Sequence, residues 1–170
     1  MHDVGLYRFC PQCGGRLEKR LIKPLEPQRL VCTACGFIFY LDPNLSVIAV
    51  IPMHEGVVMV RRAINPGYGL WVLPGGFVDL GEVVEDALVR ETQEETQLTV
   101  RPIRLLNIYS YRDHRTIIAA YVTEYVSGEL AAGDETLEAR VFGFKEIPWP
   151  RIAFSTTEEA LREYISGFGQ

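Results

Sequence analysis

The apolar residues of this 170-residue chain follow two spacings, one typical of strands and one typical of helices. Stretches rich in valine, isoleucine and aromatic residues predict strands at residues 46–52, 56–62, 99–110, 116–126 and 140–144. Apolar positions three or four residues apart predict helices over residues 82–96 and 156–165, the second capped by Ser155 or Thr156. This order of elements predicts an α+β or α/β sandwich with a mixed sheet.

Composition narrows the class of protein. Hydrophobic residues make up 48% of the chain, which is enough for a core. The longest apolar run, near residues 47–51, is too short to cross a membrane, and no basic segment followed by an apolar stretch marks a signal peptide. We therefore expect a cytoplasmic protein with no membrane partner. The net charge of −5 and the lack of a basic run argue against nucleic acid as a partner.

The cysteines all lie near the N-terminus, in two CxxC pairs separated by 18 residues. They are Cys10, Cys13, Cys32 and Cys35. This spacing is typical of a structural Zn²⁺ site made of four thiolates, which leaves no open position for water. Two disulfides in a secreted module are the alternative, and the missing signal peptide disfavours them.

The cysteines indicate a separate N-terminal module. We expect a zinc ribbon at residues 1–42 and a second domain at residues 43–170, divided at the turn Asp42-Pro43-Asn44. Residues 16–22 and 29–31 are the expected arms of a hairpin in the ribbon. A module this short cannot fold on its core alone, so the metal stabilises it. The ribbon also offers a docking or dimerising surface.

One predicted helix carries an acidic cluster. Glu91, Glu94 and Glu95 sit at i, i+3 and i+4, so their side chains share one face and repel one another. Carboxylate oxygens are the ligands that Mg²⁺ and Mn²⁺ prefer, so the cluster predicts a divalent metal site. The alternative is an ordinary surface helix with solvated glutamates.

The wider pattern favours the metal site, because it resembles the Nudix box, G-x5-E-x7-R-E-U-x-E-E-x-G-U, where U is a bulky apolar residue. The matching positions are Gly76, Glu82, Arg90, Glu91, Glu94, Glu95 and Leu98. Thr92 replaces the usual aliphatic residue. Gln97 replaces the glycine that ends the helix, and a non-glycine residue there costs about 1 kcal/mol.

The resemblance implies a fold and a set of roles. The fold is a mixed sheet between helices, and a homodimer is expected because the family often pairs. Glu91, Glu94 and Glu95 are the implied metal ligands, Glu82 is an outer ligand reached through water, and Arg90 orients the carboxylates. Together with the ribbon, this gives an α/β/α Nudix sandwich preceded by a small zinc-binding module.

Candidate residues also lie outside the box. In similar Nudix enzymes a glutamate just before the last strand reaches the metal centre, and Glu138 matches that place, with Glu135 as runner-up. The general base is one of the box glutamates or Glu138. Arg61 or Arg62 at the end of a strand is a candidate contact for a substrate phosphate. Aromatic residues that offer a ring to an adenine or flavin are Tyr109, Tyr111 and Tyr121.

These features predict hydrolysis of a diphosphate bond in a nucleoside diphosphate linked to another group. A ribbon before a Nudix domain resembles the NADH pyrophosphatases, but their SQPWPFP stretch is missing after the box. Residues 147–155 instead resemble a ribbon-bearing branch that splits FAD and ADP-ribose to release AMP. NADH cleavage, RNA processing and non-catalytic nucleotide sensing remain as alternatives.

Overall fold

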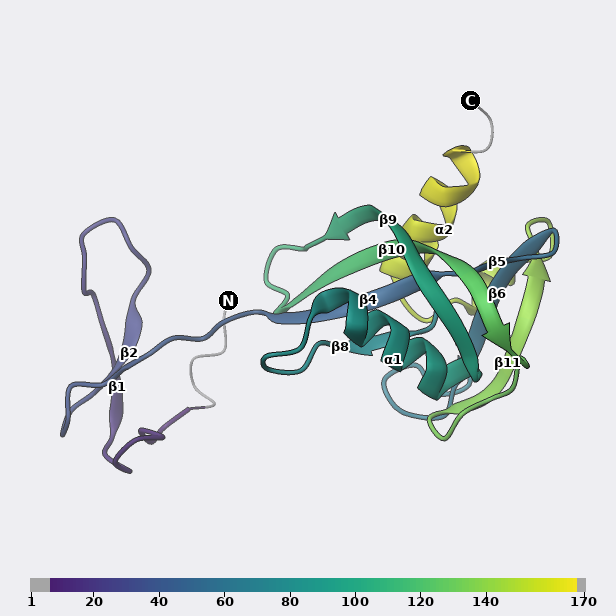
Figure 1. Cartoon of the computed structure of the whole chain (residues 1–170). Helices are drawn as coiled ribbons and strands as arrows, with labels where there is room; N and C mark the ends of the chain where they lie inside the picture. The colour runs from purple at the N-terminus through teal and green to yellow at the C-terminus, as the bar shows by residue number, and fades with distance from the viewer. Residues whose placement is uncertain (1–6, 168–170) are drawn as a thin grey trace. The chain divides into compact units, whose positions relative to one another are not determined.

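The computed structural model describes residues 7–167 (Figure 1). The chain divides into two compact units, Met1–Pro43 and Asn44–Gln170. Each unit has its own buried apolar cluster or clusters.

The first unit is a small antiparallel sheet with the strand order β1-β2-β3. Strand β1 (Leu17–Arg20) pairs with β2 (Arg29–Cys32), as the sequence predicts, and β2 also pairs with a two-residue strand that the sequence does not reveal, β3 (Ile38–Phe39). The apolar cluster of this unit consists of the buried residues Cys10, Leu17, Leu30 and Cys32, and Val31 is buried outside that cluster. Two cysteines thus make up half of a very small core, which explains why a module of this size needs a metal.

The second unit contains two four-stranded sheets. The first has the order β8-β4-β10-β9, with β8 (Gly75–Phe77), β4 (Asn44–Val50), β10 (Thr116–Gly128) and β9 (Leu98–Tyr109). It is mixed, because β4 runs parallel to β10 and the other pairs are antiparallel. The second sheet joins β11 (Thr136–Gly143), β6 (Gly56–Arg62), β5 (Pro52–Met53) and β7 (Trp71–Val72). The predicted α+β class with a mixed sheet is confirmed.

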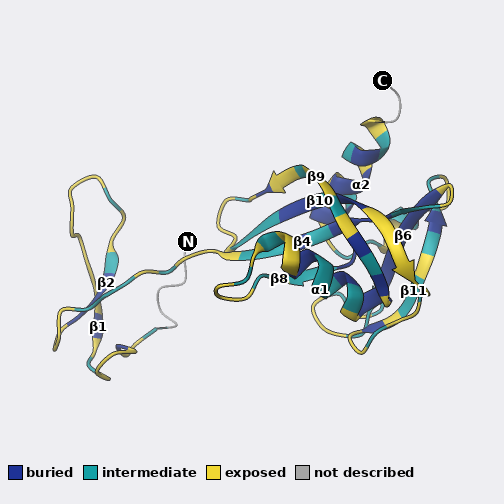
Figure 2. Cartoon of the chain, viewed as in Figure 1, coloured by how far each residue is buried: buried dark blue, intermediate teal, exposed yellow. Residues whose placement is uncertain are grey.

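Two helices pack on this unit and bury different faces. Helix α1 (Val84–Thr96) contributes Ala87 and Leu88 to one apolar cluster, and α2 (Ser155–Ser166) contributes Ala160 and Leu161 to the other. Figure 2 shows the buried residues of α1 beside exposed ones on the same helix. A short 3₁₀ turn, η2 (Trp149–Arg151), precedes α2. Neither α1 nor α2, the helices of the described residues, is long and apolar enough to span a bilayer.

The helix ends differ in part from expectation. Gln97 adopts the left-handed conformation, with φ 61° and ψ 14°, and its N–H bonds to the carbonyl of Gln93, so α1 ends as it would with glycine. The predicted cap of α2 is wrong. Phe154 is the N-cap residue, and no side chain caps the helix, because Ser155 already lies inside its first turn.

Candidate active site

Arg90 is the centre of the acidic cluster on α1. Its Nε and Nη2 donate to the two carboxylate oxygens of Glu82 at 2.8 and 2.9 Å. Its Nη1 donates to Glu91 at 2.8 Å and to Glu94 at 3.3 Å, and Nη2 reaches the carbonyl of Phe77 at 3.1 Å. The paired bonds from Arg90 hold the pKa of Glu82 down, at about 2, with help from the N–H of Asp79. One guanidinium therefore fixes three carboxylates and the strand beside them.

Glycine at position 76 makes room for Glu91. A Cβ built on Gly76 would lie 2.3 Å from the Glu91 carboxylate, which shows how closely this side chain lies against strand β8. Burial raises the pKa of Glu91, the bond from Arg90 opposes the rise, and the charges of Glu94 and Glu135 add to it. The box glycine and the box glutamate thus meet through the close approach of β8 and α1.

Glu95 is the most enclosed of the box carboxylates, with 9% of the residue exposed. Its Oε2 accepts a bond of 3.0 Å from the N–H of Gly75. Burial raises the pKa of Glu95 to about 7; the bond from Gly75 and the charge of Arg62 oppose the rise, while Glu91 and Glu135 add to it. A buried carboxylate surrounded by like charges is costly unless a cation lies beside it.

We expect Gly76→Ala to damage catalysis more than stability. The Cβ meets the movable end of the Glu91 side chain, and φ at Gly76 is not positive, so the backbone tolerates alanine. Displacing a catalytic group by about 1 Å costs roughly 100-fold in kcat. Gly75→Ala is the contrasting variant, because φ is 153° there and the Cβ would lie 2.0 Å from the carbonyl oxygen of Val47. Thermal melting is expected to show a clear loss of stability for Gly75→Ala only. A larger loss of stability for Gly76→Ala than for Gly75→Ala would contradict the close packing described for these two glycines.

A loop from β10 to β11 brings Glu135 to the cluster. Gly133 packs against the end of α1, where an added Cβ would lie 1.7 Å from the carbonyl oxygen of Glu94. Its N–H and the hydroxyl of Thr136 both donate to the carbonyl of Glu95, each at 3.2 Å. These contacts hold the loop against the helix, and the charge of Glu135 raises the pKa of both Glu91 and Glu95. The glycine is the sequence signal that such a close approach requires.

Glu138 has a different neighbour. Strand β11 pairs with β6 in a register that sets Glu138 opposite Arg61, and Arg61 Nε lies 3.4 Å from Glu138 Oε2. The register shifts between Thr136 and Glu138, so a bulge at Leu137 interrupts the alternation of the strand. The two predicted residues Arg61 and Glu138 therefore lie together.

Arg62, the neighbour of Arg61, is the arginine that acts on the box. Its charge lowers the pKa of Glu95, its Nε donates to the carbonyl of Pro66 at 2.8 Å, and its guanidinium lies 5.1 Å from the centre of the Phe154 ring. Sequence reasoning could not choose between the two arginines, because adjacent residues of a strand point to opposite faces.

The three tyrosines predicted as ring contacts for a base each bond through the hydroxyl to a glutamate on a helix. Tyr109 is 7% exposed and its hydroxyl donates to Glu163 on α2 at 2.8 Å. Tyr111 donates in the same way to Glu159 at 2.9 Å. Tyr121 donates to Glu85 on α1 at 3.0 Å. The buried ring of Tyr109 leaves no free face for a base, so its visible role is to hold α2.

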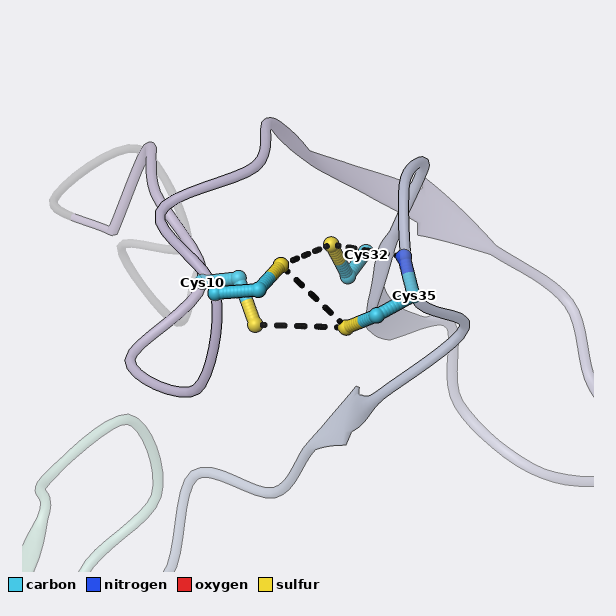
Figure 3. Close-up of side chains that lie close together, drawn as sticks. Cys10, Cys32 and Cys35 are labelled. Carbon is cyan, nitrogen blue, oxygen red and sulfur yellow. Dashed lines mark hydrogen bonds between the residues drawn. The ribbon is translucent and has the colours of Figure 1, made fainter.

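The cysteines form the tightest set of ligating side chains. Their four sulfur atoms lie within 4.8 Å of one another, and the sulfur pairs 10–35, 13–32 and 13–35 are 3.8, 3.5 and 3.3 Å apart (Figure 3). A tetrahedral Zn²⁺ with bonds of about 2.3 Å needs sulfurs about 3.8 Å apart. Backbone N–H groups also donate to the sulfurs of Cys10, Cys13 and Cys32. The cysteines are free thiols, and their arrangement fits a structural zinc.

The box carboxylates offer the oxygen ligands that a divalent cation prefers, although these oxygens are not gathered as closely as the cysteine sulfurs. Within residues 7–167 the cysteines are the only set of three or more ligating groups within 4.8 Å. Along α1 the ligating atoms are all carboxylate oxygens, and burial and mutual repulsion raise the pKa of Glu91 and Glu95. A hard cation suits such oxygens and relieves the repulsion.

Comparison with known proteins identifies the family. The profile of the NUDIX domain matches residues 42–164, which is well over half of the chain. The chain belongs to the Nudix hydrolase family. The zinc ribbon profile described as Nudix N-terminal matches residues 8–41. The resemblance seen in the sequence is thus confirmed for both parts of this Nudix hydrolase.

Named relatives of this Nudix hydrolase act on nucleotide-linked substrates. An ADP-ribose pyrophosphatase from Methanocaldococcus jannaschii is 33% identical over 156 residues, which covers 89% of this chain and 86% of the relative. A NAD-capped RNA hydrolase from Vibrio parahaemolyticus is 30% identical over 166 residues, which covers 95% of this chain but 60% of the relative. The chain thus spans little more than half the length of the NAD-capped RNA hydrolases that it matches.

Solved structures agree with the family. A NUDIX hydrolase from Nitrosomonas europaea has a TM-score of 0.89 and 32% identity, covering 94% of this chain and 91% of that one. A MutT NUDIX hydrolase from Burkholderia pseudomallei has a TM-score of 0.65 and 26% identity, covering 72% of this chain and 98% of that one. These structures support the Nudix fold, and the named relatives support pyrophosphate hydrolysis of a nucleotide-linked substrate.

Proposed function

We propose that this Nudix hydrolase cleaves the diphosphate bond of ADP-ribose or FAD with Mg²⁺ or Mn²⁺. The products are AMP and either ribose 5-phosphate or FMN. The observation that carries the proposal is the set of carboxylates held by Arg90 and by Gly75 N–H on a Nudix box that keeps every glutamate of the pattern. The similarity to an ADP-ribose pyrophosphatase over 89% of the chain supports this substrate class.

The proposed roles follow from the contacts of each side chain. Glu91, Glu94 and Glu95 hold the divalent ion, and Glu82 acts as an outer ligand whose position Arg90 fixes through two bonds. When bound, the ion neutralises the diphosphate and lowers the pKa of a water molecule. A carboxylate of the site would accept the proton of the attacking water, whose oxygen would form a bond to one phosphorus. The bridging P–O bond then breaks, and the leaving phosphate keeps the bridging oxygen.

The candidate bases outside the box are Glu135 and Glu138, and we favour Glu135 because Gly133 and Thr136 bond its loop to the end of α1. Its charge acts on Glu91 and Glu95, whereas Glu138 lies beside Arg61. We expect Glu135→Gln to lower kcat by roughly 100-fold or more, the scale of general base catalysis. Glu138→Gln is the matched variant, expected to stay within about threefold of the parent kcat. If steady-state assays show a larger loss of kcat for Glu138→Gln than for Glu135→Gln, the general base would be Glu138.

Substrate contacts can be proposed from the same geometry. The charge of Arg62 lowers the pKa of Glu95 and its guanidinium lies beside the ring of Phe154, so we propose Arg62 rather than Arg61 as the contact for a phosphate next to the metal site. Tyr111, which is less buried than Tyr109, remains a proposed contact for a base.

NADH cleavage is the second candidate function. Relatives named NAD-capped RNA hydrolases match 84% or more of this chain, which favours a substrate that contains NAD. The missing SQPWPFP stretch argues against it. Nucleotide sensing without turnover is disfavoured, because every glutamate of the box is in place.

The test is product analysis of the purified protein with Mg²⁺ or Mn²⁺. The panel holds ADP-ribose, FAD, NADH, an NAD-capped RNA, a diadenosine polyphosphate, a sugar nucleotide and a nucleoside triphosphate. In H₂¹⁸O, mass spectrometry of the products shows which phosphate gains the label and hence which phosphorus water attacks. AMP formed chiefly from ADP-ribose or FAD supports the proposal. Dominant cleavage of an NAD-containing compound, or binding without turnover, would overturn it.

A further inference from the structure

The zinc ribbon carries a hollow that the hydrolase chemistry does not use. Its volume is about 590 Å³, and it lies wholly within the first unit. Three of its lining residues are cations, Arg8, Arg16 and Lys19, and two are aromatic, Tyr7 and Phe9. These cations are not consecutive in the sequence, so no basic run indicates the cluster.

Strand pairing builds the hollow. Successive side chains of β1 point to opposite faces, so Leu17 and Lys19, two residues apart, lie on the same face. Lys19 pairs with Leu30 of β2. An antiparallel bridge sets Phe9 opposite Arg16, and the N–H of Leu17 bonds to the carbonyl of Arg8 at 3.0 Å. Backbone contacts thus bring the segments that carry the three cations close together.

The acidic residue nearest in sequence points elsewhere. Glu18 lies on the other face of β1, where its carboxylate is 3.6 Å from Arg20. Among the described residues that line the hollow, none is acidic, and no ion pair between described residues involves Arg8, Arg16 or Lys19. The lining formed by residues 7–167 is therefore cationic, although the chain has a net charge of −5.

One aromatic ring is available as a stacking surface. Phe9 is 69% exposed, whereas Tyr7 packs edge to face against Phe39 with ring centres 5.0 Å apart. A large exposed aromatic side chain among cations is the arrangement that binds single-stranded nucleic acid, in which bases stack on rings and phosphates meet Lys and Arg.

We propose that this hollow binds a short stretch of single-stranded polynucleotide, with a base on Phe9 and successive phosphates on Arg8, Arg16 and Lys19. A strand fits better than a free mononucleotide, because three cations match several phosphates. The attraction is local, because acidic residues outnumber basic ones in the second unit, which therefore does not attract a polyanion.

The test uses the full, zinc-loaded chain and a fluorescent twelve-residue oligoadenylate, followed by anisotropy at low salt. The double variant Arg16→Gln/Lys19→Gln is expected to weaken binding at least tenfold. It is also expected to reduce the slope of log K against log salt by about 1.4 in magnitude, since each lost phosphate contact contributes about 0.7. Phe9→Ala is expected to lower affinity about tenfold, and Phe9→Trp to retain it.

The matched control is Arg20→Gln/Lys23→Gln, which removes the same two residue types from positions that do not line the hollow. It is expected to bind within about twofold of the parent, and all variants keep their zinc content and their hydrolase turnover. Equal loss in the control, no measurable binding by the parent, or displacement of the oligonucleotide by AMP at the same nucleotide concentration would overturn the proposal.

Discussion

Glu94→Gln is expected to lower kcat about 1,000-fold while the protein stays folded. A metal centre supplies several kcal/mol of transition-state stabilisation, and each 1.36 kcal/mol is tenfold in rate. The amide keeps the shape of the side chain but removes the charge of a proposed ligand. The Glu94 side chain is 57% exposed, so its replacement leaves the core unchanged. Steady-state assays with Mg²⁺ measure the loss of kcat. A melting curve and the zinc content test whether the protein stays folded.

Glu85→Gln provides the control for that result. Glu85 lies on the same helix, is exposed, and contacts Tyr121 rather than the box. Its variant is expected to keep kcat within about twofold of the parent. Retained turnover in Glu94→Gln would remove Glu94 from the proposed metal ligands.

Removal of zinc is expected to unfold the first unit and to leave the second folded. Structural Zn²⁺ contributes on the order of 10 kcal/mol to small modules, and the buried cluster formed by the described residues of this unit has four members, two of them cysteines. The buried clusters of the second unit contain no residue of the ribbon. Amide NMR after treatment with a strong chelator is expected to lose the dispersed signals of Leu17 and Leu30 and to keep those of Leu88 and Leu161.

Two checks make the zinc result decisive. The parent is expected to hold one zinc per chain by elemental analysis, and adding zinc back is expected to restore the lost signals. A mild thiol reductant without chelator is expected to change nothing, whereas it would unfold a ribbon held by two disulfides. Persistence of the ribbon signals without metal would contradict the proposed role of zinc.

Local sequence determined the parts of this protein that depend on short-range geometry. The 3.6-residue helical period places Glu91, Glu94 and Glu95 on one face whatever surrounds them. The CxxC spacing likewise brings each pair of sulfurs together, and the structure draws all four within 4.8 Å. The longer strands, both helices and the Nudix family therefore followed from residues near one another in the chain.

Only the tertiary structure decided which distant residues meet. A bulge at Leu137 changes the face that β11 presents, so Glu138 lies beside Arg61 while Glu135 and Arg62 act on the box. Burial against α2 made Tyr109 an anchor, and strand pairing gathered cations that are up to eleven residues apart in the sequence into the ribbon hollow. A shift of one residue in register reverses the face of every following side chain, and the sequence pattern alone does not carry that register.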